Sequence, residues 1–547
     1  MINEINPIVI ELLHKRGIFD EDEVTEFLSE KPKKTYDPFL LLNLGAGVDL
    51  ILSAARQGKK ICIYGDYDAD GITSISLMIQ VLSHVTDRID YYMPCRFNEG
   101  YGLNKAAIEA IHQSGAGMII TVDCGSVSYD EVEYAKAIGM DIVITDHHSI
   151  TDKIPDCLVI NPMQPDCMYP FKHLAGVGVA FKLAQGIQKK AGLPKSVLTD
   201  VLDLVAIGTI GDIMPLVDEN RTMVKYGMKV LNRLQRKGMK SLVEVTCQNG
   251  AITSEHVAFI IVPHLNAVGR MFTAGVAVDL LISQDELKIK AAVNKLVESN
   301  KARKQVQEDT YQHCVEIVDK HLHKNSFLMV CSPDAHEGIA GIVAGKIKDK
   351  YHKPAIVITP SGELCKGTGR SLEKINLYEL LCHFEGMFSK FGGHAGACGF
   401  LMKREDLRSL KHGLEEKMKQ IIESDPTVFD KNYNIDITLQ GKDITIELGE
   451  LLEVLAPFGN QNNKPLLCIE EVQIKNPISM GEGGKHMRFT ALCRDGHTIQ
   501  CVLFNRASEY HELFHVGALV KMMGCLEVQH WNGNKRIQFF VEELLSM

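Results

Sequence analysis

The chain has 547 residues, 45% of them hydrophobic and 23% charged, which is typical of a globular protein and too long for a single hydrophobic core. No apolar run approaches the roughly twenty residues of a transmembrane helix, so no membrane-spanning segment is expected. The net charge of −10 lacks the basic excess typical of nucleic-acid-binding proteins, although a local cation site or a narrow basic groove is compatible with it.

Cysteine usage and the N-terminal sequence predict the compartment. The fifteen cysteines are scattered, without any C-x-x-C pair. The first residues, MINEINPIVIELLHKRG, mix acids with apolar residues and do not follow a signal-peptide layout. These features predict reduced thiols and a cytoplasmic location.

After an N-terminal helical segment at 1–45, residues 46–284 alternate short apolar runs with stretches of helical spacing such as 74–85 and 128–139. The runs are rich in β-branched residues and end in polar or turn residues. This alternation predicts βαβ units and a mostly parallel sheet, whose strands share one carboxyl edge where ligands bind. The predicted strands are 59–66, 88–94, 117–123, 141–148 and 157–162.

Residues 285–322 contain no glycine or proline and place apolar residues at steps of three and four, which predicts one long helix with Asp285 as its N-cap. Such a helix either connects two domains or packs in a core, and the two interpretations are compatible. Residues 323–425 form a second α/β region with the glycine-rich stretches GTGRS (367–371) and FGGHAGACGF (391–400).

Residues 433–547 consist of regularly spaced, strand-like runs separated by turns, which predicts a small β-barrel or sandwich. The expected fold class is therefore α/β and multidomain. It comprises a parallel-sheet domain, a long connecting helix, a second α/β domain and a C-terminal β-barrel.

Acidic and imidazole side chains follow three of the predicted strands, and one more acid lies in a later turn flanked by glycine. They are Asp66, Asp68 and Asp70, then Asp123, then Asp146, His147 and His148, and finally Asp212. Taken singly, each has an ordinary structural explanation as a solvated acidic turn, a helix cap or a buried imidazole. Together on one edge, so many carboxylates would repel one another strongly without cations.

The chemistry of this set favours divalent cations. Carboxylates with one or two imidazoles suit Mn²⁺ or Mg²⁺ better than they suit thiolate-bound zinc. Two such ions can position and activate a water molecule and stabilise the oxygens of a phosphoryl centre. The residues therefore predict a two-cation site that hydrolyses a phosphoester.

Four stretches, DYDADG, VDCG, TDHH and GDIMPL, resemble in this order the signatures of the DHH phosphoesterase superfamily. GTGRS and GGHAGACGF resemble its DHHA1 substrate-binding domain. Further stretches are similar to the single-stranded-DNA-specific exonucleases of the superfamily, and GKHMRFTA with WNGNKRIQ resembles their OB domain. These further stretches are 91–104, 174–183, 264–270 and 338–347.

The resemblance implies a role for each residue of the metal centre. Asp68 and Asp70 would each ligate one of the two metals, and Asp123 would bridge both. His147 and Asp212 would complete the ligand set. His148 would lie beside the scissile phosphate as a donor or electrostatic stabiliser, and Asp66 would support the catalytic site without necessarily ligating a metal.

The resemblance also implies contacts with the substrate. Arg96 and Arg270 would bind the 5′-terminal phosphate, because a guanidinium fork suits that anion. Residues of the two glycine-rich loops would hold nearby phosphates, although tight turns alone also explain the glycines. These residues are Arg370, Ser371, Gly392, Gly393 and His394. Trp531, beside Asn532, Asn534, Lys535 and Arg536, either stacks on a base or packs against the barrel.

The function implied by the resemblance is a metal-dependent exonuclease that hydrolyses single-stranded DNA from the 5′ end to mononucleotides, in recombination and repair. Two alternatives remain open: a phosphodiesterase acting on oligonucleotides or cyclic dinucleotides, and a non-catalytic replication scaffold. Expected partners are single-stranded DNA and either a helicase or a single-strand-binding protein, with no membrane association and a monomeric state. The chain departs from the family pattern at Gln461, where glycine is usual, and at Cys95, where a polar residue is common.

Overall fold

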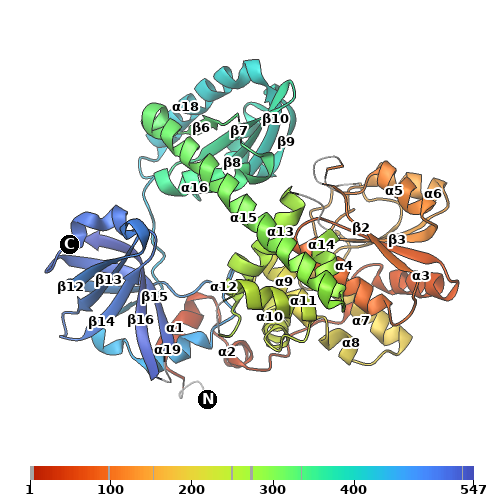
Figure 1. Ribbon diagram of the computed structural model, residues 1–547, viewed down its shortest axis with the longest axis horizontal. Coiled ribbons are helices and arrows are strands. Elements are labelled where there is room, and N and C mark those ends of the chain that lie inside the picture. The colour runs from red at the N-terminus through yellow and green to blue at the C-terminus, as the bar shows by residue number, and fades with distance from the viewer. Residues whose placement is uncertain are drawn as a thin grey trace. The chain divides into compact units, whose positions relative to one another are not determined.

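The computed structural model describes residues 5–95, 99–100, 102–151, 153–247, 250–271, 275–333, 335–531 and 534–547. The chain divides into two compact units. Figure 1 labels their helices and strands and colours them by residue number. One unit contains residues 1–262, 281–284 and 433–547, and the other contains 263–280 and 285–432. Within the described ranges, no helix is both long and apolar enough to cross a membrane.

The predicted parallel sheet is confirmed in the first unit. Its strand order is β2-β1-β3-β4-β5, and all neighbouring strands are parallel. The strands are β1 (Lys60–Gly65), β2 (Ile89–Tyr92), β3 (Ala116–Val122), β4 (Asp141–Thr145) and β5 (Leu158–Ile160). The three middle strands, β1, β3 and β4, are almost wholly buried, which explains their continuous apolar sequences.

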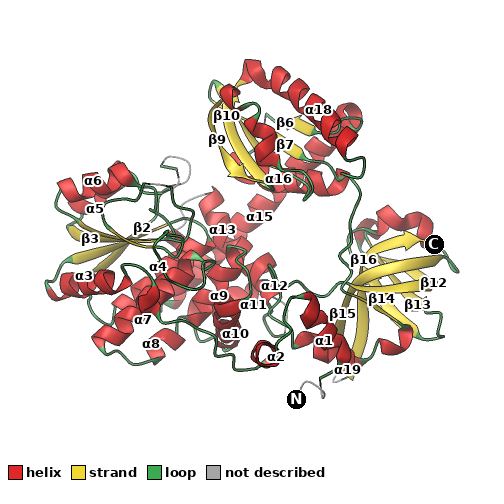
Figure 2. Cartoon of the chain, turned by 180° about the vertical axis from the view of Figure 1, so that it is seen from behind, coloured by secondary structure: helices red, strands yellow, loops and turns green. Residues whose placement is uncertain are grey.

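Helices cover both faces of this sheet (Figure 2). α5 (Lys105–Gln113) and α6 (Tyr129–Ala137) pack on one face, where Tyr64 and Ile119 join their core. α3 (Leu44–Arg56), α4 (Ala69–Leu82) and α7 (Gly176–Ala191) lie on the other face. The sheet is thus a doubly covered α/β layer with its carboxyl edge open at the ends of the strands.

A helical layer extends this unit beyond α7. α9 is flanked by α4, α7 and α10. The helices of this layer are α8 (Ser196–Thr199), α9 (Leu202–Gly211), α10 (Asp218–Leu231), α11 (Lys237–Thr246), α12 (Ser254–His256) and the π-helical turn Val257–Ile261. Among the fully buried polar groups here, Lys182 of α7 pairs with Glu219 of α10, and Glu219 also accepts a hydrogen bond from Tyr169. Because each charge has its partner, this buried pair is compatible with a stable core.

The first unit also contains the C-terminal barrel, which confirms the predicted small β-barrel. Its strand order is β11-β12-β13-β14-β16-β15, and pairing of β12 with β15 closes it. Its elements are β11 (Ile437–Leu439), α19 (Ile446–Glu453), β12 (Leu467–Met480), β13 (His486–Leu492), β14 (Thr498–Leu503), β15 (Leu519–Trp531) and β16 (Asn534–Ser546). The N-terminal helices α1 (Pro7–Lys15) and α2 (Glu21–Leu28) bury Val9, Leu12, Leu13 and Val24 in the barrel's core, which the sequence patterns did not predict.

The second unit begins with most of α13 (Val262–Met271) and α14 (Gly275–Ile282), of which Val262, Leu281 and Ile282 belong to the first unit. The predicted long helix follows as α15 (Glu286–Ile317) and continues through a π-helical turn to Leu322. Asp285 is its N-cap, as expected, and accepts hydrogen bonds from the amides of Leu287 (2.9 Å) and Lys288 (3.3 Å). The end of the helix packs into the core of the following α/β region through Cys314, Val315 and Val318.

That α/β region has a mixed sheet with the order β6-β7-β8-β10-β9, in which only β6 and β7 are parallel. Its strands are β6 (Leu328–Cys331), β7 (Ala355–Ser361), β8 (Leu364–Arg370), β9 (Phe388–His394) and β10 (Ala397–Lys403). The accompanying helices are α16 (Glu337–Tyr351), α17 (Leu377–Cys382) and α18 (Leu407–Ser424). The α/β prediction for this region is therefore confirmed.

Candidate metal centre

Three of the acidic segments follow adjacent strands of the parallel sheet. Asp66 comes directly after β1, Asp123 after β3 and Asp146 after β4. Because β3 lies between β1 and β4 and all three run in parallel, their carboxyl ends meet at one edge. The three carboxylates are buried, with exposed fractions of 6% for Asp66 and 2% for the other two.

The start of α4 brings two more carboxylates to this edge. Asp68 is the N-cap of α4 and accepts hydrogen bonds from the amides of Asp70 (3.0 Å) and Gly71 (3.2 Å). Asp70 is 1% exposed, and its two oxygens accept from the amides of Gly176 (2.7 Å) and Val177 (2.8 Å) at the start of α7. The positive end of a second helix therefore holds the Asp70 carboxylate.

His147 lies at the centre of the cluster. Its Nε2 atom is 3.1 Å from Asp123 Oδ1, 3.5 Å from Asp212 Oδ2 and 3.9 Å from Asp70 Oδ2. Asp212 reaches this position as the C-cap of α9, and Asp123 adopts a left-handed backbone with φ of 60°. A non-glycine residue in that conformation is strained, which is frequent at functional sites.

Three overlapping groups of side chains have possible ligand atoms within 4.8 Å of one another. Each group combines buried carboxylates with carboxylate or imidazole partners of the kind that Mn²⁺ and Mg²⁺ prefer. The groups are Asp66, Asp68 and Asp123; Asp70, His147 and Asp212; and Asp123, His147 and His148. The structure thus brings together every residue that the sequence assigned to the metal centre.

Burial and mutual repulsion make the cluster unfavourable without cations. Burial, followed by the neighbouring carboxylates, raises the pKa values of Asp70 and Asp123 well above the usual range. Burial and the charge of Asp68 raise the pKa of Asp212 to about 7. A bound cation would reverse this effect by favouring the ionised carboxylates, so the donor set fits divalent metals.

Asp146 holds the neighbouring His148, a role that the sequence patterns did not reveal. Its Oδ1 atom contacts Nδ1 of His148 at 2.8 Å and accepts the His148 amide at 3.1 Å. Burial disfavours the imidazolium, but the hydrogen bond and charge of Asp146 outweigh it and raise the pKa of His148 to about 9. The contact with Asp146 thus engages Nδ1 of His148 and favours the protonated form of the ring.

Two glycines that the sequence patterns also missed permit this packing. A Cβ atom at Gly176 would lie 2.5 Å from Cβ of Asp123, and one at Gly208 would lie 2.9 Å from Oδ1 of Asp70. No side chain fits at either distance without displacing a carboxylate. Only the three-dimensional arrangement reveals this requirement. Gly208 lies inside α9, where glycine is otherwise unfavourable, and Gly176 is the first residue of α7.

The glycine-rich segments of the second unit meet on adjacent strands. His394 of β9 pairs with Ala397 of β10, which in turn pairs with Arg370 of β8. Gly393 has φ of 146° and packs against the backbone of Cys398, so a side chain is excluded there. Ser371 follows Arg370 and buries a hydroxyl that has no hydrogen-bond partner among the described residues. Arg370, Ser371, Gly392, Gly393 and His394 thus lie in one part of this sheet.

Three predicted binding residues cannot be placed in the same way. Arg96 lies outside the described residues, as does Asn532 beside Trp531. Arg270 belongs to the backbone of α13 and Trp531 ends β15, but their side chains lie outside what the structure describes.

Comparison with known proteins gives matches along most of the chain. Family models match residues 60–209 (DHH family, N-terminal domain), 324–420 (DHHA1 domain) and 435–543 (RecJ OB domain). The single-stranded-DNA-specific exonuclease RecJ of Bacillus subtilis is 36% identical over 98% of this chain and 68% of its own length. RecJ of Escherichia coli is 31% identical over 85% of this chain and 83% of its own. A crystal structure of RecJ with Mn²⁺ from Thermus thermophilus matches 100% of this chain and 76% of its own, with a TM-score of 0.83 and 26% identity.

Proposed function

The chain belongs to the RecJ family of the DHH phosphoesterase superfamily, and on that premise we propose that it is a metal-dependent exonuclease that hydrolyses single-stranded DNA. It would act from the 5′ end, release mononucleotides and serve recombination and repair. The observation that carries the proposal is the cluster of buried carboxylates around His147, because this donor set fits two divalent cations.

The proposed metal ligands are Asp68, Asp70, Asp123, His147 and Asp212. Asp68 and Asp70 belong to different groups of neighbouring donors, which supports one metal at each of these two residues. Asp123 shares a group with Asp68 and contacts His147 of the Asp70 group, which supports a bridging role for Asp123. Asp66 shares a group with Asp68 and Asp123 and would support that side of the centre. The cations, Mn²⁺ or Mg²⁺, would activate a water molecule and neutralise the charge that develops on the phosphoryl oxygens.

His148 would contact the scissile phosphate. Asp146 contacts its Nδ1 atom and raises the pKa of the ring, so the imidazolium would donate to a phosphate oxygen as charge develops. Its side chain is 47% exposed, unlike that of His147 at 8%, which leaves it accessible to a substrate. The two histidines therefore differ in role although they are adjacent in sequence.

Phosphates farther along the strand would bind to Arg370, Ser371, Gly392, Gly393 and His394 of the second unit. Their position on neighbouring strands and the unpartnered hydroxyl of Ser371 support this assignment. Arg96 and Arg270 would bind the 5′-terminal phosphate through bidentate hydrogen bonds. Trp531 would stack on a base of the strand.

The barrel offers a second place for bases to stack. Phe504, directly after β14, is 47% exposed. It stacks on Phe540 of β16 at a centroid distance of 5.9 Å and meets His486 of β13 edge-on at 5.2 Å. The exposed Arg488 lies in the same cross-strand row as Phe540. An exposed aromatic group next to an arginine on these strands of an OB barrel suits single-stranded nucleic acid.

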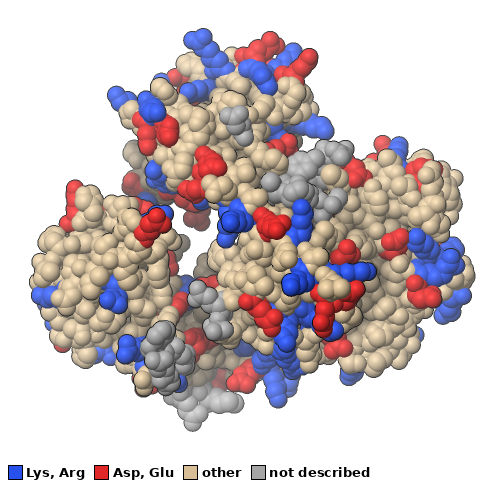
Figure 3. Space-filling view, in the orientation of Figure 1, with Lys and Arg blue, Asp and Glu red and all other residues tan. Residues whose placement is uncertain are grey.

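Single-stranded DNA is thus the proposed partner, together with either a helicase or a single-strand-binding protein, for a monomer in the cytoplasm. Basic and acidic side chains are interspersed on the face shown in Figure 3, and the visible face of the barrel carries few charges. On this face, DNA contacts would depend on local groups.

The deciding experiment incubates the protein with Mn²⁺ and DNA labelled at either end, single- or double-stranded. We expect mononucleotides from the 5′ end of single strands only. Inertness would favour a scaffold, and cleavage of dinucleotides alone would favour a small-substrate phosphodiesterase. Asp123→Ala should lower activity at least about 100-fold while the protein remains folded, because even residues behind metal ligands typically contribute 10–100-fold. Asp130→Ala, an exposed acid on α6, is the matched control.

A further inference from the structure

A cavity of about 350 Å³ lies in the first unit, away from the metal centre. Gln80 of α4 contributes to its wall, about 15 Å along that helix from Asp70. Asp203, at the start of α9, contributes to the opposite wall, whereas Asp212 caps the other end of the same helix. The cavity therefore contacts the far ends of two helices that carry metal-centre residues.

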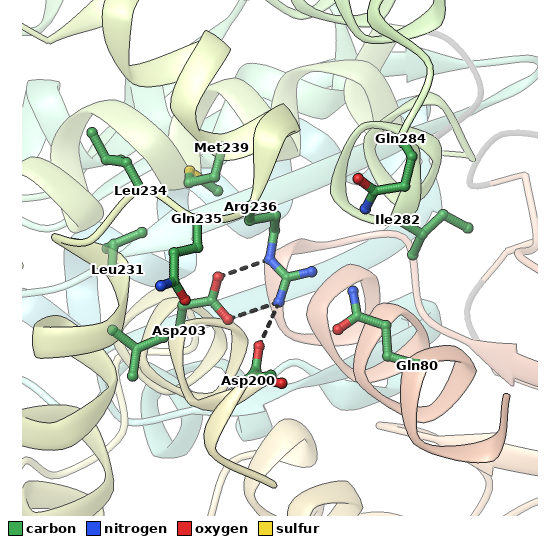
Figure 4. A pocket seen from close by; sticks show the side chains of 11 residues that line it. Gln80, Asp200, Asp203, Leu231, Leu234, Gln235, Arg236, Met239, Ile282 and Gln284 are labelled. Carbon is green, nitrogen blue, oxygen red and sulfur yellow. Dashed lines mark hydrogen bonds and ion pairs between the residues drawn. The ribbon is translucent and has the colours of Figure 1, made fainter. Parts of the chain in front are cut away.

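An ion pair at the centre of the cavity leaves no spare positive charge (Figure 4). Arg236 donates to both oxygens of Asp203, at 2.7 and 2.8 Å. Two of its remaining three N–H groups donate to the carbonyls of Asp200 (3.1 Å) and Leu281 (3.0 Å). Because Arg236 is neutralised and the Asp200 carboxylate is exposed, the cavity is unsuited to a phosphate or another anion.

Uncharged hydrogen-bonding groups surround this pair. The side chains of Gln80, Gln235 and Gln284 line the cavity, and none of them has a hydrogen-bond partner among the described residues. Each side-chain amide offers two N–H donors and one carbonyl oxygen as an acceptor. In Figure 4, Gln80 and Gln284 lie on one side of the ion pair, and Gln235 lies on the other.

Apolar side chains complete the wall. Leu231 and Met239 are each 1% exposed and lie with Leu234 on one side of the ion pair, while Ile282 lies on the other (Figure 4). Leu234 has a left-handed backbone with φ of 50°, which is unfavourable for a leucine and holds the loop after α10 against the cavity. Such walls suit a flat ring, and a methionine sulfur contacts aromatic rings favourably.

We propose that this cavity is a binding site for a nucleobase, as the free base or the nucleoside. The volume falls at the lower end of the range for small-molecule sites, which accommodates one nucleoside but no folded peptide. Glutamine amides pair bidentately with the edge of adenine, so adenosine is the expected best ligand. This site would recognise the base and no phosphate, whereas the catalytic centre would act on a phosphate.

Calorimetric titration of the 547-residue protein with adenosine tests this proposal, with metal removed by a chelator so that binding is measured without nuclease activity. We expect a dissociation constant on the order of 0.1 mM from the affinity per atom of ligands of this size. Because binding is measured without catalysis, failure here would leave the proposed exonuclease function untouched, and the reverse also holds.

Variants and probes locate the site. The double variant Gln80→Ala/Gln235→Ala should weaken adenosine binding at least tenfold, and Gln80→Trp, which fills the cavity from its partly exposed edge, should abolish it. Gln113→Ala, an exposed glutamine on α5, is the control and should bind as wild type does. Absence of adenosine binding, unchanged binding in both cavity variants, or competition by inorganic phosphate would each overturn the proposal.

Discussion

At the scale of single residues, the metal centre depends on groups that the DHH motifs contain and on groups that they do not. Asp123 and His147 are motif residues that the sequence placed on one sheet edge, and the structure brings them to 3.1 Å. Gly176 and the amides that hold Asp70 belong to the start of α7, far away in sequence. The proposed ligands are therefore readable from sequence, whereas the residues that position them are not.

Gly176→Ala should weaken metal binding indirectly, by displacing Asp123. The new methyl group would lie 2.5 Å from Cβ of Asp123, so the carboxylate must move and metal affinity should fall about 10–100-fold. Titration of Mn²⁺ against the variant, with circular dichroism to verify folding, measures this. Gly345→Ala is the control, since that helical glycine has open space around its Cβ position and should bind metal normally. Wild-type affinity in Gly176→Ala would contradict the packing argument.

The raised pKa values predict how metal binding depends on pH. A carboxyl group with an unfolded pKa near 3.9 and a folded value of about 7, as for Asp212, keeps a proton in the folded protein at pH values where the unfolded chain has lost it. The stability of the metal-free protein should therefore decrease as pH rises from about 4 to 7.

Cations must displace such protons, so Mn²⁺ affinity should increase about tenfold per pH unit for each displaced proton below pH 7, and level off above it. Thermal unfolding with and without Mn²⁺ across this range measures both effects. The stabilisation by Mn²⁺ should be larger at pH 7.5 than at pH 5.5. An effect of equal size at both values would show that the carboxylates ionise normally.

At the scale of elements, the fold explains why distant segments form one site. The parallel order β2-β1-β3-β4-β5 places Asp66, Asp123 and Asp146 at one edge, and two helix ends, the start of α4 and the end of α9, complete it. Alternating apolar and helical patterns predicted a mostly parallel sheet, which is confirmed, but not its strand order. They did not predict that the start of α7 would face Asp70, because helix packing depends on side chains from several segments.

At the same scale, the exposed aromatic side chain next to strand β14 of the barrel is expected to contribute to DNA binding. Phe504→Ala should lower affinity for single-stranded DNA by about 1–3 kcal/mol, the usual contribution of a stacked base, and a double change with Phe540 should cost more. Fluorescence anisotropy with labelled oligonucleotides and chelated metal measures it. Phe19→Ala, which removes a phenylalanine that is 67% exposed outside the barrel, is the control. Equal affinities for Phe504→Ala and wild type would show that Phe504 does not contact DNA.

At the scale of the whole molecule, the division into two units does not follow the order of the chain. The N-terminal helices α1 and α2 share one core with the C-terminal barrel. Arg221 of α10 also donates to the carbonyls of Leu455 (3.1 Å) and Ala456 (3.0 Å) beside that barrel. The predicted boundaries at residues 45, 284, 322 and 425 therefore stay predictions, to be tested by limited proteolysis.

Leu12→Ala should destabilise the barrel although it lies more than four hundred residues away in sequence. Leu12 is fully buried in the shared core, and such truncations cost about 2–5 kcal/mol. The single tryptophan, Trp531, ends β15, so its fluorescence during denaturant unfolding follows the barrel. Leu40→Ala, at a leucine that is 44% exposed, is the control. An unchanged barrel transition in Leu12→Ala would show that the helices do not support it.

The sequence by itself determined the elements and the ligand types of this protein. Period-two and helical patterns, the N-cap Asp285 and the acids after buried strands are local features, and local propensity and burial decide them. The tertiary structure alone decided which helix holds Asp70, why Gly176 and Gly208 have no side chain, and where α1 and α2 pack. These are contacts between segments far apart in the chain, so their physical cause is close packing of surfaces that exists only after folding.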